Sequence, residues 1–332
     1  MRLFLAALCL LLGGCGGKPA GIRVRIANVG NGLQTFCLPV SLAATLGYYK
    51  EEGLDAQLEN LASSAKAMQA LAGGSVDVAG LVYSQTIQVA AEGQRVRSFF
   101  IVNRRPSNVI IVSPSASGRI RRVEDLKGAL VGVTSPGSAS HLWTNFYLSA
   151  HGVRPSEFTP IGIGVGASGI AAIENGRVDA ASMGGGDHFH LLRRHPDLRV
   201  LVDSSTPEGL RESYGTDAYA GGAVSAKRDW LEGNPDTARR LARALLRALQ
   251  WIAAHKPEEI RDRLPDGFRS QDASVDVEII RWGIAGYTAD GRMPRGAPEA
   301  MRTYLESTVE NVRKAKIDLA ATWTNEFLPE GK

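Results

Sequence analysis

Residues 130–148 carry the clearest candidate for binding chemistry. A short apolar run at 130–133 precedes the polar turn TSPGSAS, and apolar residues at near-helical spacing follow. This pattern predicts a strand, a loop and a helix in that order. The first amides of such a helix lack partners within it and the helix dipole adds positive charge there, so the loop can hold a small anion without Lys or Arg. An ordinary helix cap by Ser138 or Ser140 explains the same residues.

Two further motifs have catalytic or metal-binding spacing. Residues 164–169 read GVGASG, a formal dinucleotide-binding spacing with Asp187 downstream, but the matching residues 61–64 have no such glycines. Residues 187–190 read DHFH, but two histidines two residues apart need not share a helix face, and no third ligand stands at metal-binding spacing. There is no Gly-x-Ser-x-Gly elbow and no P-loop. We therefore expect no enzyme, no catalytic residue, no cofactor and no metal.

The composition is that of a globular protein of two domains. The chain has 332 residues, of which 44% are hydrophobic and 22% are charged. Lys and Arg exceed Asp and Glu by 38 to 34, and the basic residues form only short clusters. Nucleic-acid binding usually needs a denser basic stripe. We expect no nucleic-acid partner and a monomer.

The N-terminus predicts export. Arg2 precedes an apolar run, residues 3–12, that is too short to span a bilayer. The following Leu-Gly-Gly-Cys resembles a bacterial lipobox, which implies a lipoprotein signal peptide at residues 1–14, lipidation of Cys15, and a tether at 15–21. A plain secretory signal or an uncleaved anchor is the alternative. Cys37 is the one cysteine left in the body, where we expect a small buried side chain rather than a nucleophile.

Strand and helix patterns alternate along the first hundred residues, with strands expected at 22–27, 54–58, 76–81 and 96–102 and helices at 39–52, 63–71 and 83–91. This alternation predicts a mostly parallel sheet with helices on both faces. Toward the C-terminus, helices are expected at 235–255, 257–263, 275–284, 298–316 and 319–327. A Gly-x-Val-Asp phrase that ends at Asp77 recurs at Asp179, and this repeat suggests two similar α/β lobes. We expect both aspartates to be turn residues rather than catalytic carboxylates.

Several phrases together resemble one family. They are GYYKEEGLD at 47–55, the two Gly-x-Val-Asp repeats, VEDLKG at 123–128 and VGVTSPGS at 131–138. They are similar to the nitrate, sulfonate and taurine group of solute-binding proteins from ABC importers, which includes relatives that bind thiamine-precursor pyrimidines. The resemblance runs from about residue 22 to about residue 292. A distant enzyme branch of this fold makes a thiamine pyrimidine, but its cysteine-rich signature is absent here.

The resemblance implies a fold of two Rossmann-like lobes with mixed, mostly parallel sheets, the periplasmic-binding-protein type II architecture. Lobe 1 would take residues 22–110 and 226–332, and lobe 2 residues 114–218. Two crossings near 109–113 and 218–225 would act as hinges that close the lobes over a ligand.

The binding site follows from this architecture, because ligands of open α/β sheets lie beyond the carboxyl ends of the strands. We expect anion donors at Ser135, Gly137, Ser138 and Ala139, and orienting hydrogen bonds from Asn28, Asn31 and Gln34. Apolar walls would come from Phe36, Tyr83 and Trp143, and further lining from Ser84 and Tyr219. Asp187 would either bind an amino or ring N–H group of the ligand or cap the helix that begins at His188.

These inferences predict a lipid-anchored, periplasm-facing receptor. It would capture a small organic anion, a sulfonate or a carboxylate, and deliver it to a membrane permease driven by a separate ATPase. A pyrimidine or other aromatic heterocycle is the alternative ligand. A sensory binding protein and, less favoured, a dinucleotide-dependent enzyme are the alternative functions.

Overall fold

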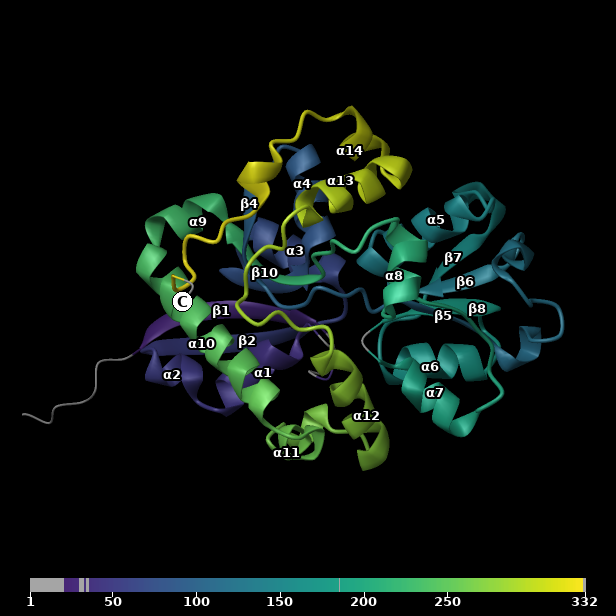
Figure 1. Ribbon diagram of the computed structural model, residues 1–332, viewed down its shortest axis with the longest axis horizontal. Coiled ribbons are helices and arrows are strands. Elements are labelled where there is room, and N and C mark those ends of the chain that lie inside the picture. Colours follow the sequence, from purple (N-terminus) through teal and green to yellow (C-terminus); the bar gives the residue numbers. More distant parts are fainter. Residues whose placement is uncertain (1–20, 30–32, 34–35, 185, 331–332) are drawn as a thin grey trace, which may run out of the picture.

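The computed structural model describes residues 21–29, 33, 36–184 and 186–330, and it contains two sheets flanked by helices (Figure 1). We call the part built on the first sheet lobe 1 and the part built on the second sheet lobe 2. The strands of the first sheet, in pairing order, are β2 (Leu54–Leu61), β1 (Ile22–Val29), β3 (Val78–Val82), β10 (Gly222–Lys227) and β4 (Val96–Ile101). Those of the second sheet are β7 (Thr159–Gly162), β6 (Leu130–Val133), β8 (Ala180–Met183), β5 (Val109–Val112) and β9 (Val200–Asp203).

Both sheets mix strand directions in the same way. In lobe 1, β1 pairs in parallel with β2 and β3, whereas β10 runs antiparallel to β3 and β4. In lobe 2, β6 pairs in parallel with β7 and β8, whereas β5 runs antiparallel to β8 and β9. The one antiparallel strand in each sheet therefore lies next to the sheet's edge strand. The predicted fold class of two α/β lobes with mixed sheets is confirmed.

The aspartate of the repeated Gly-x-Val-Asp phrase makes equivalent hydrogen bonds in both lobes. The Asp77 carboxylate accepts a 2.8 Å hydrogen bond from the backbone of Arg25 on β1, and the Asp179 carboxylate accepts one of 2.8 Å from the backbone of Leu130 on β6. Each aspartate also forms an ion pair, Asp77 with Arg25 and Asp179 with Arg119. The two carboxylates thus join the end of a helix to the neighbouring strand, as expected of turn residues.

The chain passes between the sheets twice. Because β5 lies wholly in the second sheet and β10 wholly in the first, the passages are residues 102–108 and 215–221. The first passage precedes the predicted hinge at 109–113, whereas the second overlaps the predicted hinge at 218–225 over residues 218–221. Asn103 joins the two passages, since its side-chain oxygen accepts a 2.6 Å hydrogen bond from the amide of Gly222 and its carbonyl accepts one of 3.0 Å from Gly221.

Most helices follow the predicted pattern, with three differences. The helix expected from Pro39 to Glu52 is broken at Gly47, whose φ of +79° lies in the left-handed region, so it forms α1 (Leu38–Thr45) and α2 (Tyr48–Glu51). The helix expected at 298–316 is interrupted at Val309 into α13 (Ala297–Thr308) and α14 (Glu310–Lys314). The segment expected to be helical at 319–327 contains only a short 3-10 turn, Leu319–Thr322.

The other helices cover the sheets. Lobe 1 carries α3 (Ser64–Gly73), α4 (Tyr83–Ala91), α9 (Arg228–Gly233), α10 (Pro235–Ala254), α11 (Pro257–Asp262) and α12 (Ala273–Ile284). Lobe 2 carries α5 (Ala139–Ala150), α6 (Ala167–Glu174), α7 (His188–Arg194) and α8 (Pro207–Tyr214).

The C-terminal helices reach across to lobe 2. Helix α13 packs against both α4 of lobe 1 and α5 of lobe 2, and α12 packs against α7 (Figure 1). One hydrophobic core therefore extends over both lobes, with Tyr83 and Ile87 from α4, Trp143 from α5, and Met301 and Leu305 from α13. Assigning all of residues 226–332 to lobe 1 misses this bridging role. Among the helices that the structure describes, none combines the length and apolarity needed to cross a membrane.

Candidate ligand-binding site

Two helices, one from each lobe, begin at the junction between the sheets. Helix α4 starts at Tyr83 directly after β3, and α5 starts at Ala139 after the loop that follows β6. Two small adjoining cavities of about 30 and 60 Å³ lie between them. Residues common to the linings of both cavities are Phe36, Val82, Ser107, Asn108 and Ala139. We call these two cavities together the central cleft.

The two cavities differ in their walls. The smaller one has several aromatic residues and one arginine in its wall; besides the common residues its lining includes Ser84, Asn103, Arg105, Trp143, Tyr214, Tyr219 and Tyr304. The larger one is mostly small and polar; its lining includes Ser64, Thr134, Ser138, Ser140, Val165 and Gly184. A ligand here would contact aromatic faces at one end and hydroxyl and amide groups at the other.

The uncommitted polar groups around the smaller cavity are hydrogen-bond donors. The ring nitrogen of Trp143 and the hydroxyl of Tyr304 are buried and have no partner in the described part of the chain. The Ser84 side chain makes no hydrogen bond to any described residue and is 6% exposed. Arg105 lies at the wall without an ion pair to a described residue. Such convergent donors suit a negatively charged or strongly accepting ligand group.

The tyrosine hydroxyls of this wall remain protonated at neutral pH. Burial raises the pKa of Tyr219 to about 12, and it raises the pKa values of Tyr214 and Tyr304 well above their usual range. The Tyr214 hydroxyl is hydrogen-bonded to Tyr219 and Asn108. The Tyr304 hydroxyl has no partner among the described residues and is free to donate to a ligand.

The TSPGSAS loop uses most of its own donors. The amide of Thr134 donates to the Ser140 hydroxyl at 2.9 Å, and the hydroxyls of Ser138 and Ser140 are 3.0 Å apart. The amide of Gly137 donates to Nδ1 of His141 at 3.0 Å. Ser138 caps α5 by accepting from the His141 amide, as predicted. The loop is thus largely self-satisfied, which weakens the expectation that its hydroxyls hold an anion.

Two donors of this loop region stay available. The amides of Ala139 and Ser140 open α5 and have no hydrogen-bond acceptor among the described residues. Both residues line the larger cavity. The Ser135 hydroxyl instead crosses the junction and donates to the Ser63 hydroxyl of lobe 1 at 3.2 Å.

Other predicted site residues lie away from these cavities. Tyr83 is fully buried and its hydroxyl is 2.6 Å from that of Thr322, so it belongs to the core rather than to the cleft wall. The Asn28 side chain is also fully buried, and it donates to the Ser41 hydroxyl at 3.0 Å. Asn31, Gln34 and Cys15 lie outside the described residues. Phe36, Ser84, Ser138, Ala139, Trp143 and Tyr219 are all at the central cleft.

Asp187 takes a role that neither prediction anticipated. Its carboxylate makes no capping bond to α7 and instead accepts a 2.6 Å hydrogen bond from the amide of Gly166, at the start of α6. Burial raises the pKa of this carboxyl to about 6. A protein carboxylate therefore occupies the helix start where a dinucleotide would place its pyrophosphate. This arrangement argues against reading GVGASG as a cofactor loop.

His188 of the DHFH run packs at the lobe junction. The His188 ring lies 5.4 Å from that of Trp282 on α12, and burial lowers the pKa of His188 to about 4. The indole of Trp282 also donates to the Ser205 hydroxyl of lobe 2 at 2.8 Å. Within the described residues, no three His, Cys, Asp or Glu side chains gather closely enough to hold a metal ion.

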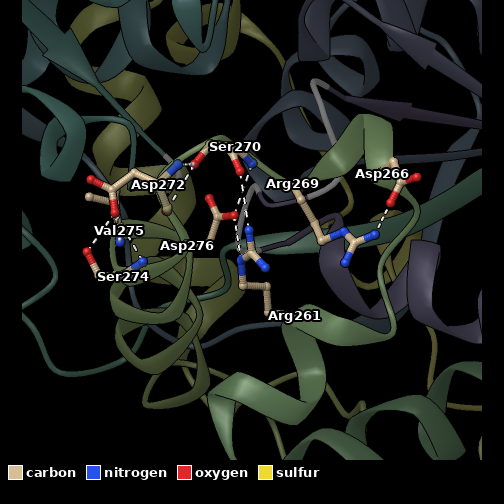
Figure 2. Close-up of polar contacts among 8 residues, drawn as sticks. All are labelled: Arg261, Asp266, Arg269, Ser270, Asp272, Ser274, Val275 and Asp276. Atoms are coloured by element: carbon tan, nitrogen blue, oxygen red, sulfur yellow. Dashed lines mark hydrogen bonds and ion pairs between the residues drawn. The ribbon is translucent and has the colours of Figure 1, made fainter.

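Helix α12 is fixed at its start by a buried ion pair (Figure 2). Oδ2 of Asp276 accepts from Nε of Arg261 at 2.9 Å and from the amide of Ser270 at 3.0 Å, and the Asp276 side chain is fully buried. Asp272 caps the helix by accepting from the amides of Ser274 and Val275. These contacts fix the start of α12, the helix that carries Trp282, to α11 and the loop between them.

Sequence reasoning missed the residues contributed by the two passages between the sheets and by α13. Asn103, Arg105, Ser107 and Asn108 follow β4 without any recognisable motif, and Tyr304 is one of many apolar residues on its helix. The resemblance placed crossings near this region, and a polar run directly before β5 was the available signal.

Two matched α/β lobes, joined by two passages and enclosing a small cleft, define a protein of the periplasmic-binding-protein type. Comparison with known proteins then gives the family. Residues 34–260 match the sequence model of the family described as NMT1/THI5 like, and the chain belongs to this family. A solved structure from Bordetella bronchiseptica RB50 is 32% identical, covers 93% of this chain and 96% of its own, and has a TM-score of 0.86.

Other similar proteins include binding proteins and enzymes. The alkanesulfonate-binding protein SsuA from Xanthomonas axonopodis pv. citri shares the fold, with a TM-score of 0.69 at 18% identity over 92% of this chain and 99% of its own. A binding protein of Bacillus subtilis, YtlA, is 24% identical over 91% of this chain and 88% of its own length. The nitrate/nitrite binding protein NrtA of Nostoc is 24% identical over 57% of this chain and 41% of its own length. A 4-amino-5-hydroxymethyl-2-methylpyrimidine phosphate synthase of Schizosaccharomyces pombe is 28% identical over 43% of this chain and 39% of its own length.

Proposed function

We propose that this chain is the solute-binding receptor of an ABC importer. It captures a small organic anion of the sulfonate or carboxylate class in the central cleft and delivers it to a membrane permease that is driven by a separate ATPase. We also propose that it faces the periplasm and is anchored by lipid at Cys15. The observation that carries the proposal is the convergence of uncommitted donors on one small cleft.

The donors come from both lobes. Lobe 1 supplies the Ser84 hydroxyl at the start of α4, and lobe 2 supplies the amides of Ala139 and Ser140 at the start of α5. Each helix start also carries partial positive charge, so a bound anion would interact favourably with both helices at once. An anion held in this way would favour the closed arrangement of the lobes, which is what an import receptor requires.

The size of the cleft favours a small ligand. One water molecule needs about 10–15 Å³ of such space, so cavities of about 30 and 60 Å³ admit only a few heavy atoms unless the lobes move apart. A nitrate, sulfonate or carboxylate group is of this size. Solved structures of sulfonate-binding and nitrate-binding proteins share this fold over 92% of the chain, which also supports a receptor.

A pyrimidine or other aromatic heterocycle is the second candidate ligand. The rings of Phe36, Trp143, Tyr214, Tyr219 and Tyr304 all border the smaller cavity, and such a wall suits stacking on a flat ring. The free Trp143 N–H would then donate to a ring acceptor of the ligand. This ligand would need a wider opening than the cleft has here.

Native mass spectrometry of freshly purified protein tests the proposal. We expect a retained small molecule that, once released, carries a sulfonate or carboxylate group. A retained neutral heterocycle would favour the second candidate. If the protein carries nothing and no sulfonate, carboxylate, nitrate or pyrimidine raises its melting temperature, the receptor proposal fails.

A further inference from the structure

A second and larger pocket lies beside the passages between the sheets. Its volume is about 510 Å³, within the range typical of small-molecule sites. Three regions distant in sequence form it, within 104–105, 205–219 and 285–295, and its lining includes Arg104, Arg105, Thr206, Asp217, Tyr219 and Arg295. A neighbouring pocket of about 230 Å³ shares Arg105 and Thr206 with it and extends to Trp282.

Three arginines of this pocket have no anionic partner. The side chains of Arg104, Arg105 and Arg295 form no ion pair and no hydrogen bond with any described residue. Nearby arginines behave differently: Arg211 pairs with Asp217 at 3.1 Å, and Arg292 donates to the carbonyl of Pro329 at 2.5 Å.

The acidic residues at the pockets do not compensate these arginines. The Asp217 carboxylate is already paired with Arg211, outside the pocket lining. The Asp203 carboxylate, in the neighbouring pocket, accepts from both the amide and the hydroxyl of Ser205, at 2.9 and 2.6 Å. The larger pocket therefore presents an excess of positive charge on a concave surface.

The side chains of Arg104, Arg105 and Arg295 are exposed, so water screens part of their mutual repulsion, and a bound anion would neutralise the rest. Arg104 and Arg105 come from the first passage, whereas Arg295 comes from the segment before α13, almost two hundred residues later. Guanidinium groups bind phosphate oxygens through paired, charge-assisted hydrogen bonds, and several together favour a multivalent oxyanion.

We propose that this pocket is a binding site for a small phosphorylated compound that adjoins the central cleft and shares Arg105 and Tyr219 with it. The walls include residues of both passages, Arg104 and Arg105 from one and Asp217 and Tyr219 from the other. Any movement of the lobes about these passages changes the pocket. Occupancy of the pocket and closure of the central cleft are therefore coupled, and each ligand alters the affinity for the other. The site does not depend on which ligand the cleft takes.

Calorimetric titration of the full chain with inorganic pyrophosphate tests this site. We expect saturable one-to-one binding that weakens about tenfold in Arg104→Gln and about tenfold in Arg295→Gln, because each removes a charged hydrogen-bonding partner. Arg121→Gln and Arg177→Gln are matched controls, since both side chains are exposed, lie in lobe 2 and form no ion pair with a described residue. Both controls should bind as the unaltered chain does.

Three results would overturn the site. They are no saturable binding by the unaltered chain, an equal loss of binding in the controls, and unchanged binding in both Arg104→Gln and Arg295→Gln. A Ser138→Asp variant, which alters only the central cleft, separates this site from the proposed receptor function. If pyrophosphate binding is lost in Ser138→Asp and retained in Arg295→Gln, the anion occupies the cleft and the second site does not exist.

Discussion

Asp276 shows how a single residue positions one side of the lobe junction. Its carboxylate is completely buried beside Arg261, and the pair holds the loop before α12 in place (Figure 2). The helix that begins there carries Trp282 to its contact with Ser205 of lobe 2. The buried Asp276 charge therefore fixes the start of the helix whose other end contacts Ser205 across the junction.

Replacing Asp276 with Asn should lower the free energy of unfolding by about 3 kcal/mol, because Arg261 would remain largely buried without its counter-charge. Chemical denaturation monitored by circular dichroism measures this loss. Asp266→Asn is the matched control, since Asp266 also pairs with an arginine but its side chain is 93% exposed, and it should leave stability unchanged. Equal effects of the two substitutions would refute the role given to the buried pair.

His188 predicts a pH dependence of stability. Its pKa is lowered by burial to about 4, against about 6.5 in an unfolded chain, so on acidification the unfolded state binds the proton first. Its contribution to stability is therefore complete above pH 6.5 and is lost as the pH falls toward 4. Between pH 7 and 4.5, the unaltered chain should lose about 2 kcal/mol more than His188→Gln, as measured by denaturation at each pH.

Asp187 supplies a check of opposite sign. Its pKa is raised by burial to about 6, so its contribution is present at low pH and is lost as the pH rises through 6. Asp187→Asn should therefore show a larger loss of stability on acidification than the unaltered chain. If His188→Gln and Asp187→Asn shifted the profile in the same direction, the account of both groups would be wrong.

Local signals predict single residues well only where the partner is close in sequence. Ser138 is the cap of α5 as predicted, because its acceptor role is fulfilled three residues later at His141. Asp187 eluded prediction because its partner, Gly166, lies in another helix start twenty-one residues earlier. Tyr304 was missed for the same reason, since α13 meets lobe 2 only after the whole chain has folded.

At the scale of elements, the starts of α4 and α5 were predictable because a strand, a polar turn and a helix follow one another in sequence. The first crossing was placed too late, whereas the second prediction includes residues 218–221 of the observed passage. Residues 109–112 were assigned to a crossing, yet all four are buried in strand β5 of the second sheet. An apolar run of four residues does not show which sheet it enters, because pairing partners are set by long-range contacts.

Gly222 tests the packing at the second passage. A Cβ atom at this position would lie 2.0 Å from Cβ of Phe36, which lines both cavities of the central cleft. Gly222→Ala should therefore displace Phe36, lower the free energy of unfolding by about 1–3 kcal/mol, and weaken ligand binding. Thermal denaturation and calorimetry measure the two effects.

Gly233→Ala is the control for this substitution, because no atom lies within 4 Å of a Cβ placed there. It should leave both stability and binding essentially unchanged. If Gly222→Ala behaved like Gly233→Ala, the contact between Gly222 and Phe36 would not exist in solution.

At the scale of the whole molecule, the lobes are joined by more than two passages. Helices α12 and α13 both reach lobe 2, and the Ser135–Ser63 and Trp282–Ser205 hydrogen bonds span the junction. If the two lobes move apart, these two hydrogen bonds must break and α13 must slide against α4 or α5. A bound anion would favour the arrangement in which both hydrogen bonds are kept. The family and the two-lobe plan could be predicted from the repeated phrases, but the bridging by the C-terminal helices could not, because it depends on contacts between distant segments.

Calorimetric titration with a panel of sulfonates, carboxylates and nitrate, on the unaltered chain and on Ser138→Asp, tests the central claim most directly. Asp also caps helices well, so the variant should fold, but its charge would stand at the cleft where the anion binds. We predict that at least one anion binds the unaltered chain and that Ser138→Asp weakens it by about 2 kcal/mol or more, while Ser149→Asp on the exposed end of the same helix does not. Unchanged affinity in Ser138→Asp would contradict an anion site at the start of α5.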